Sequence, residues 1–207
     1  MSASDRLVLG FDTSAAHCAA ALVSGDRVLA TRCEAMRKGQ AERLMPMLAE
    51  VLAEAGTGWR DLAALGIGTG PGNFTGTRIA VAAGRGLALG LGIPAEGVSV
   101  SDAYADGRDV IVCLPAPRDM VHLAHAGEIV TTENTIPRGW TAPLTGPAAA
   151  ALGALTGHAV VAAPDLATAI ARIAARRAGP GRPRPAPFYL RPADAAPPAD
   201  APPAILP

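Results

Sequence analysis

The N-terminal half of the chain alternates short apolar runs with polar or glycine-containing turns. Ser24-Gly25-Asp26 offers hairpin turn chemistry between the second and third runs. Runs of this length, bounded by turn residues, are typical of buried or half-buried strands. We therefore predict strands over residues 7–11, 17–23, 27–33, 63–68 and 95–98.

Helical periodicity separates these strands. One helix is predicted to begin at residues 42–43, because Pro46 is tolerated best in a first turn, and to end at Ala55 before Gly56. A second helix is predicted from about Thr75 to Leu91, and Ser99 is a cap for a short third one. Three strands followed by alternating helices and strands indicate an α/β fold that starts with a meander.

The pattern weakens after residue 107. We predict a strand pair over 109–114 and 120–126, and an amphipathic helix over 165–177. The stretch 139–164 has no charged residue, but its Ala, Pro and Gly content favours loop, helix and strand over a membrane span. From Gly179 the chain is proline-rich, which predicts an extended tail.

Composition narrows the classes of protein. Among 207 residues, 18 basic side chains balance 18 acidic ones and only 3% are aromatic. A neutral chain with few aromatics is not typical of a stand-alone nucleic-acid binder, and 50% hydrophobic residues exclude global disorder. The three cysteines form no CxxC pair and favour reduced, buried thiols; no signal peptide is evident, so we expect a cytoplasmic protein without a membrane anchor.

The strongest local candidate for chemistry is the glycine-rich segment 70–78, between a predicted strand and a predicted helix. Glycines permit close backbone approach, and a helix start favours an anion such as phosphate; the alternative is a tight turn without a ligand. The polar turn after the first strand is a second candidate, with a capped turn as its alternative. The candidate nucleotide- or phosphate-binding residues are Asp12, Thr13, Ser14, Gly70, Gly72, Thr75, Gly76 and Arg78.

Metal and nucleophile signals are weak. His122 and His125 would point to opposite faces of a strand, and no HExxH pattern or GxSxG elbow is present. We therefore predict no catalytic residue and no metal site in this chain.

Small residues follow the second predicted helix at spacing four in two rows. One row is Gly76, Ala80, Gly84 and Ala88; the other is Ala82, Gly86 and Gly90. Because each helical glycine costs about 1 kcal/mol relative to alanine, we expect close packing, with one face on the sheet and one on another subunit. The predicted interface residues are Leu44, Met45, Met47, Leu48, Val51, Ala80, Gly84 and Ala88, and a bulky residue at Gly84 is expected to disrupt association more than folding.

These motifs together resemble a known family. The runs 9–14, 43–48 and 70–79, and the Phe-Tyr-Leu-Arg element at 188–191, occur in the order and spacing of the TsaB (YeaZ) family. The resemblance implies an actin/Hsp70/sugar-kinase-like (ASKHA) fold of two α/β lobes, the second shortened. It also implies an N-terminal lobe over 1–106 that carries the partner-binding helices, a reduced lobe over 107–178, and a tail over 179–207 with a docking element at 187–191.

The resemblance further implies a role. TsaB-like proteins are non-catalytic activating or dimerisation subunits that pair with TsaD, are joined by TsaE, and help form N6-threonylcarbamoyladenosine at position 37 of tRNA. The chain would hold no cofactor of its own, while the complex would use ATP, Mg²⁺ and a metal held by TsaD. The same face could instead form a homodimer.

Two departures and two other functions accompany this expectation. Gln40-Ala41 replaces a His-Thr of many relatives, and 115–118 reads Pro-Ala-Pro-Arg where many have Asp-Ala-Arg. A stand-alone ASKHA-type nucleotide-binding enzyme is the main alternative function. A peptidase of the M22 type is the weakest, because no catalytic constellation supports it.

Overall fold

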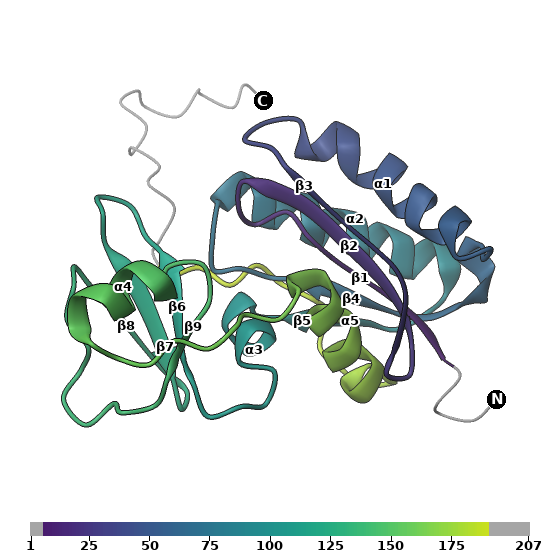
Figure 1. The fold of residues 1–207 in the computed structure, drawn as a ribbon. Helices are drawn as coiled ribbons and strands as arrows, with labels where there is room; N and C mark the ends of the chain where they lie inside the picture. Colours follow the sequence, from purple (N-terminus) through teal and green to yellow (C-terminus); the bar gives the residue numbers. More distant parts are fainter. Residues whose placement is uncertain (1–5, 191–207) are drawn as a thin grey trace, which may run out of the picture.

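The computed structural model describes residues 6–190, which build two β-sheets joined through short helices and a crossing C-terminal helix (Figure 1). The first sheet has the order β3-β2-β1-β4-β5. Its strands are β1 (Leu7–Asp12), β2 (His17–Ser24), β3 (Arg27–Ala35), β4 (Leu62–Gly68) and β5 (Ala95–Val98). The first three strands pair antiparallel and the last two run parallel to β1, which is the meander followed by crossovers that the sequence predicts.

Two helices cover one face of the first sheet, α1 (Gln40–Glu54) and α2 (Phe74–Leu91). Figure 1 shows α1 above the strands and α2 behind them, and a single apolar cluster fills the space between helices and sheet. Phe11 and Ile67 from the strands and Met47 from α1 are fully buried in that cluster. The short 3₁₀ turn at Trp59–Asp61 leads from α1 into β4.

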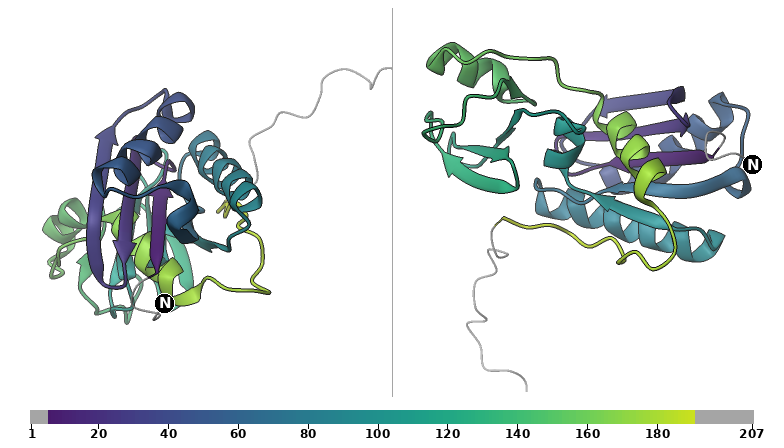
Figure 2. Two further views of the ribbon diagram at one scale, coloured as in Figure 1. Left: turned by 90° about the vertical axis from the view of Figure 1, so that its right-hand side faces the viewer. Right: turned by 90° about the horizontal axis from the view of Figure 1, so that it is seen from below.

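The opposite face of the first sheet is covered by α5 (Leu166–Arg177), as the two views of Figure 2 show. A Cβ on Gly10 of β1 or on Gly66 of β4 would overlap the α5 backbone, so these glycines let the helix lie directly on the strands. Asp165 caps α5, and its carboxylate accepts from the Thr168 amide at 2.8 Å. The helix predicted within the segment 107–178 therefore packs on the N-terminal sheet.

The second sheet repeats the topology of the first in shortened form. Its order is β8-β7-β6-β9, with a meander of three strands and a parallel fourth. The strands are β6 (Ile111–Pro115), β7 (Val121–His125), β8 (Glu128–Thr132) and β9 (Leu144–Thr145). Residues 133–143 form a loop where the first lobe has α1. The second lobe is therefore shorter because this helix is missing. The domain bounds themselves stay a prediction.

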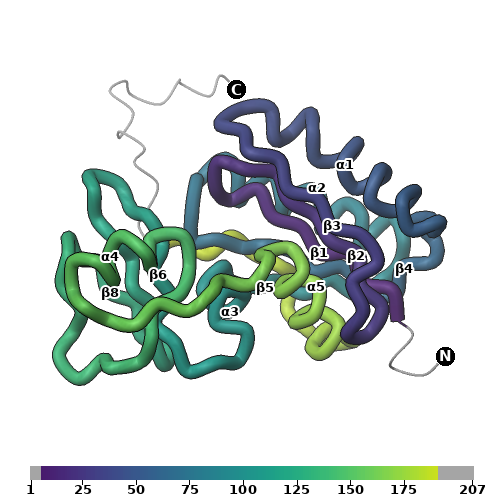
Figure 3. The backbone as a smooth tube through the Cα atoms, viewed as in Figure 1, coloured from purple at the N-terminus to yellow at the C-terminus, as the bar shows by residue number. Residues whose placement is uncertain are grey.

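Short helices complete the second half. α3 (Val100–Ala105) follows β5 and is capped by Ser99, as predicted, and α4 (Ala149–Thr156) packs on β9. Figure 3 traces the backbone from the first sheet through α3 into the second and back through α5. Within residues 6–190, no helix is long and apolar enough to cross a bilayer.

Three expectations need correction. α1 begins at Gln40 and keeps Pro46 in its interior, because the buried face of the helix extends on both sides of the proline. The sequence did not indicate β8, and it predicted helix and strand within 139–164 without giving the bounds of α4 or β9. Cys33 is exposed on β3, whereas Cys18 and Cys113 are buried, and all three thiols are free.

Candidate functional site

The polar turn after β1 is folded onto itself. Asp12 is fully buried, and its Oδ1 accepts from the Ser14 amide at 2.9 Å and the Ser14 hydroxyl at 3.0 Å. The His17 ring Nε2 lies 2.7 Å from the same oxygen, because the turn brings the start of β2 back beside the end of β1. Asp12 Oδ2 is buried without a hydrogen-bond partner and faces Gly68. The carboxylate is therefore held inside the protein by its own neighbours.

The glycine-rich segment packs directly against this turn. The Asn73 amide donates to the Ser14 carbonyl at 2.5 Å, and the Thr13 hydroxyl donates to the Gly76 carbonyl at 2.7 Å. A Cβ on Gly72 would overlap the Ser14 carbonyl oxygen, and one on Gly76 would overlap that of Thr13. What lies close to these glycines is therefore the β1–β2 turn of the same chain.

The first turn of α2 is capped from within. Asn73 Oδ1 accepts from the Gly76 amide at 2.8 Å, and Thr77 bonds the Asn73 carbonyl through both its amide and its hydroxyl. Thr75 is exposed, whereas Gly70 is buried. The structure therefore brings the predicted phosphate-site residues together around two turns, but most of their polar groups already bond one another. Phosphate binding by them stays a prediction.

Arg78, the remaining member of that predicted site, holds the C-terminal strap, which we define as residues 179–190. Its Nε donates to the Tyr189 hydroxyl at 2.9 Å, and its guanidinium carbon lies 3.8 Å from the centre of the Phe74 ring. Phe74 and Tyr189 stack with ring centres 4.9 Å apart. The Phe188 amide donates to the Thr69 carbonyl at 2.8 Å. These contacts hold Phe188 and Tyr189 against the first lobe. The docking element 187–191 as a unit stays a prediction, and Arg191 lies outside the described residues.

A second anchor fixes the other end of the strap. Arg182 forms a two-pronged ion pair with Glu96 of β5, whose residue is only 3% exposed. The hydrogen bonds from Arg182 to Glu96 raise the pKa of the guanidinium further above its ordinary value. The strap therefore supplies the ion-pair partner of a carboxylate that is buried in the first sheet.

Between the two lobes lies a large hollow, which we call the interlobe cleft, with a volume of about 1180 Å³. Its floor and walls come from the β1–β2 turn, the glycine-rich loop, α3, the β6–β7 turn and the strap. Burial raises the pKa of the Tyr104 phenol to about 12. Polar and aromatic side chains that line it include Ser14, His17, Arg37, Gln40, Asn73, Phe74, Tyr104, His122, Phe188 and Tyr189.

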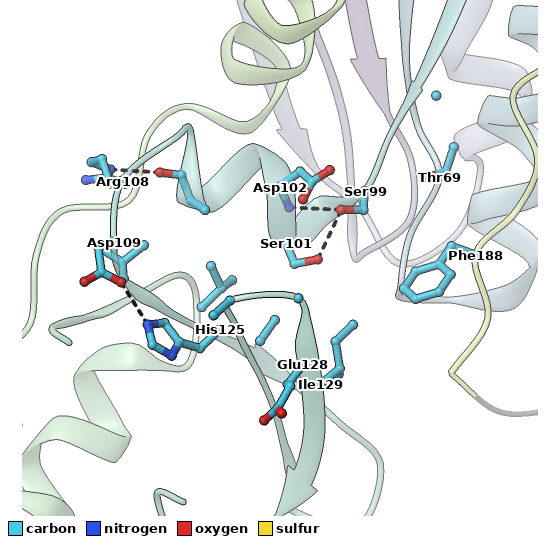
Figure 4. Close-up of a pocket in the computed structure, with 17 residues that line it drawn as sticks. Thr69, Ser99, Ser101, Asp102, Arg108, Asp109, His125, Glu128, Ile129 and Phe188 are labelled. Carbon is cyan, nitrogen blue, oxygen red and sulfur yellow. Dashed lines mark hydrogen bonds and ion pairs between the residues drawn. The ribbon is translucent and has the colours of Figure 1, made fainter. Parts of the chain in front are cut away.

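Figure 4 shows a second, smaller cavity of about 490 Å³ on the other side of α3. Ser99 and Ser101 lie at one side of it, and the His125 ring bonds Asp109 at 2.9 Å on the other. Asp102 and Glu128 add two more carboxylates to the wall. Phe188 of the strap reaches this cavity as well as the interlobe cleft.

The possible metal ligands of residues 6–190 are dispersed. No group of three or more His, Cys, Asp or Glu side chains there is placed to hold a metal ion. His122 bonds Thr131 at 2.8 Å, and the ring of His125 packs on Trp140 with centres 5.1 Å apart. The histidines of β7 thus take part in separate local contacts.

The predicted subunit-interface residues are mostly in this chain's own core. The row Ala80 and Gly84 of α2 faces the first sheet, where a Cβ on Gly84 would overlap Ile67 and lie 3.3 Å from Phe11. Ala88 is half-buried against the same cluster, and Met45 is 41% exposed. A bulky residue at Gly84 would therefore disturb folding first, which corrects our expectation for that position. The α1 members that are buried are Leu44, Met47, Leu48 and Val51.

The exposed face of α2 belongs to the other small-residue row. Ala82, Gly86 and Gly90 are exposed, and no atom lies within 4 Å of a Cβ built on Gly86 or Gly90. Leu89 stands beside them and is 84% exposed. On α1, the exposed Met45 is followed four residues later by the exposed Ala49. We call these outward-facing positions of the two helices, with the exposed Arg85 among them, the α1/α2 outer face.

Sequence reasoning missed the residues that enter the interlobe cleft from elsewhere in the chain. Arg37 lies in the connection before α1, and Tyr104 on α3 carries no motif. His17 could have been found, since a hairpin from Asp12 returns the chain close to its start. The others depend on how the second lobe and the strap sit on the first.

Comparison with solved structures defines the class of protein. YeaZ from Pseudomonas aeruginosa superposes with a TM-score of 0.67 at 27% identity, covering 83% of this chain and 93% of that one. An uncharacterized protein with similarity to peptidase YeaZ from Pseudomonas aeruginosa gives 0.68 at 26%, covering 90% and 100%. Component A of Acidaminococcus fermentans (R)-2-hydroxyglutaryl-CoA dehydratase gives 0.52 at 12%, covering 83% and 98%, and shares the fold alone. The fold is thus of the ASKHA class, as the resemblance implied.

The sequence itself supports a closer assignment. The family model for tRNA N6-adenosine threonylcarbamoyltransferase (TsaD) matches residues 33–179. The chain therefore belongs to this family, and with its YeaZ neighbours to the TsaB (YeaZ) group within it. The comparison with curated proteins finds no match.

Proposed function

We propose that this chain is a non-catalytic subunit that binds and activates a TsaD-type threonylcarbamoyltransferase in tRNA modification. The family assignment supplies the reaction, and one observation carries the accessory role: the α1/α2 outer face exposes Leu89 and Met45 together with small residues, beside the exposed Arg85, and open space lies over Gly86 and Gly90. Leu89 at 84% exposure projects from a helix side on which small residues let another helix approach closely. Such a face suits a helix of a partner protein.

The rest of the proposed assembly follows from the family. The TsaD-type partner holds the catalytic metal and binds tRNA, and a TsaE-type ATPase joins the pair and uses ATP with Mg²⁺. This chain needs no cofactor for a supporting role. In the absence of its partner, the same outer face can pair with a second copy, so homodimer and heterodimer compete for one surface.

Co-purification with the TsaD-type protein of the same organism tests the proposal. The wild-type chain should retain the partner through affinity capture and gel filtration, whereas Leu89→Glu should lose it, because a carboxylate would be buried against apolar atoms. Leu155→Glu is the matched control, since Leu155 is 67% exposed on α4 of the other lobe. Equal retention by both variants, or no complex with the wild type at micromolar concentrations, would refute the proposal.

A further inference from the structure

The interlobe cleft differs from the rest of the molecule in charge. The whole chain carries as many acidic as basic residues. Among the described residues that line the cleft there is no aspartate or glutamate, whereas Arg37, His17 and His122 all contribute to its wall. The cavity of Figure 4 has the opposite balance, because three carboxylates and one arginine, Arg108, line it. The charge of the cleft wall therefore favours an anionic occupant.

The cleft also gathers aromatic rings. Four of the seven aromatic residues of the chain line it: Phe74, Tyr104, Phe188 and Tyr189. Phe188 and Tyr189 keep 39% and 36% of their surface exposed, so their rings are accessible from the cleft side. Exposed aromatic faces stack on nucleobases with little dependence on sequence. Although the chain has few aromatic residues, more than half of them therefore line this one cleft.

Arg37 supplies a charge that the protein itself does not use. It is exposed on the connection between β3 and α1, and it forms no ion pair or hydrogen bond with another described residue. Arg43 differs in this respect, because it is paired with Glu34 and Glu50. Arg37 and the exposed rings line the same cleft, so the guanidinium can contact a phosphate of a strand whose base stacks on those rings.

We propose that the interlobe cleft binds an unpaired nucleotide of an RNA strand, with the base against Phe188 and Tyr189 and a phosphate at Arg37. The inference rests on the proposed function, in which tRNA is the substrate of the complex. A free nucleoside triphosphate suits the cleft less well. The glycine-rich loop that would cradle its phosphates is filled by the carbonyls of Thr13 and Ser14. Stacking and a single phosphate contact remain, which is the way proteins hold bases of single-stranded loops.

Fluorescence anisotropy with the full-length chain tests this proposal. The probe is a labelled RNA hairpin with an unpaired loop; its competitors are the same sequence closed as a duplex and free AMP. Unlabelled hairpin should displace the labelled hairpin at a lower concentration than the duplex or AMP does. A duplex that competes equally would indicate binding to the backbone alone, and AMP that competes equally at the same concentration would indicate a mononucleotide site. Either result would overturn the proposal, as would absence of hairpin binding.

Two adjacent residues provide a matched pair of variants. Arg37→Glu and Lys38→Glu make the same change of charge in one exposed connection, but only Arg37 lines the cleft. We expect Arg37→Glu to weaken hairpin binding by about tenfold or more, and Lys38→Glu by no more than about threefold. Equal losses would assign the effect to general electrostatics and refute a specific contact.

The stacking part is tested at Tyr189. Tyr189→Phe keeps the ring and should bind within about twofold of wild type, whereas Tyr189→Leu should lose about tenfold. Thermal unfolding of both variants reports on whether the strap is still docked. Co-purification of the TsaD-type partner with Arg37→Glu separates the two proposals, because that variant should keep the partner while losing RNA affinity.

Discussion

Glu96 and Arg182 show how a residue near the C-terminus completes the first sheet. Glu96 lies on β5 with 3% of its surface exposed, and Arg182 is its charge partner in the C-terminal strap. Removing one member of a buried pair leaves the other charge desolvated, which is worse than removing both. The strap is therefore tied energetically to the lobe it crosses.

Arg182→Ala should lower the free energy of unfolding, because the buried Glu96 carboxylate loses its charge partner, but by less than the loss of a fully buried pair, because the Arg182 head is half exposed to water. Denaturant unfolding measures this loss. Arg184→Ala, an exposed change in the same strap, should be close to neutral. Adding Glu96→Gln to Arg182→Ala should restore part of the stability, and an unchanged or larger loss would contradict the account.

Also at the residue scale, the sequence located the polar turns but not the groups that they contact. Glycines at 72 and 76 predict close approach of something to the backbone, and the structure identifies it as the chain's own Thr13 and Ser14. Local sequence cannot distinguish a ligand from a neighbouring turn, because both need the same absence of a Cβ. Cys33 shows a similar limit, since exposure of an edge-strand residue depends on what covers the sheet.

At the scale of elements, α2 shows what periodicity can and cannot decide. Spacing of four identifies two small-residue rows equally well, and only the position of the sheet decides which row is buried. Gly84 faces Ile67, and Gly86 faces open space. Element types and most bounds in the first lobe follow from the sequence, whereas β8 and the bounds of β9 do not, because these strands are short and carry a weak alternation.

A pair of alanine substitutions tests this assignment of faces. Gly86→Ala should stabilise the monomer by up to about 1 kcal/mol, because alanine favours the helix and meets no neighbour. Gly84→Ala should destabilise it by about 1–3 kcal/mol, since the added methyl group overpacks a filled core. Chemical denaturation of the two variants beside wild type provides the comparison. Effects of the same sign would show that the faces are wrongly assigned.

At the scale of the whole molecule, a five-stranded sheet and a four-stranded sheet that repeats the order of its first four strands line one cleft, and the second lobe has a loop where the first has α1. The full lobe presents the α1/α2 outer face, while the reduced lobe contributes the β6–β7 turn to the cleft. This division suits a subunit that uses one surface for a protein partner and another for a ligand. Sequence reasoning reached the fold through its motifs, but the cleft lining required the relative placement of three distant segments.

The central claim is that this chain supports a modification that another subunit catalyses. Reconstitution with the TsaD-type and TsaE-type proteins, tRNA, ATP and threonylcarbamoyl donor measures it directly, with threonylcarbamoyladenosine in digested tRNA as the readout. We predict modification with the complete set, loss when this chain is omitted or replaced by Leu89→Glu, and retention with Leu155→Glu. Full modification without this chain, or modification by this chain alone, would contradict the account.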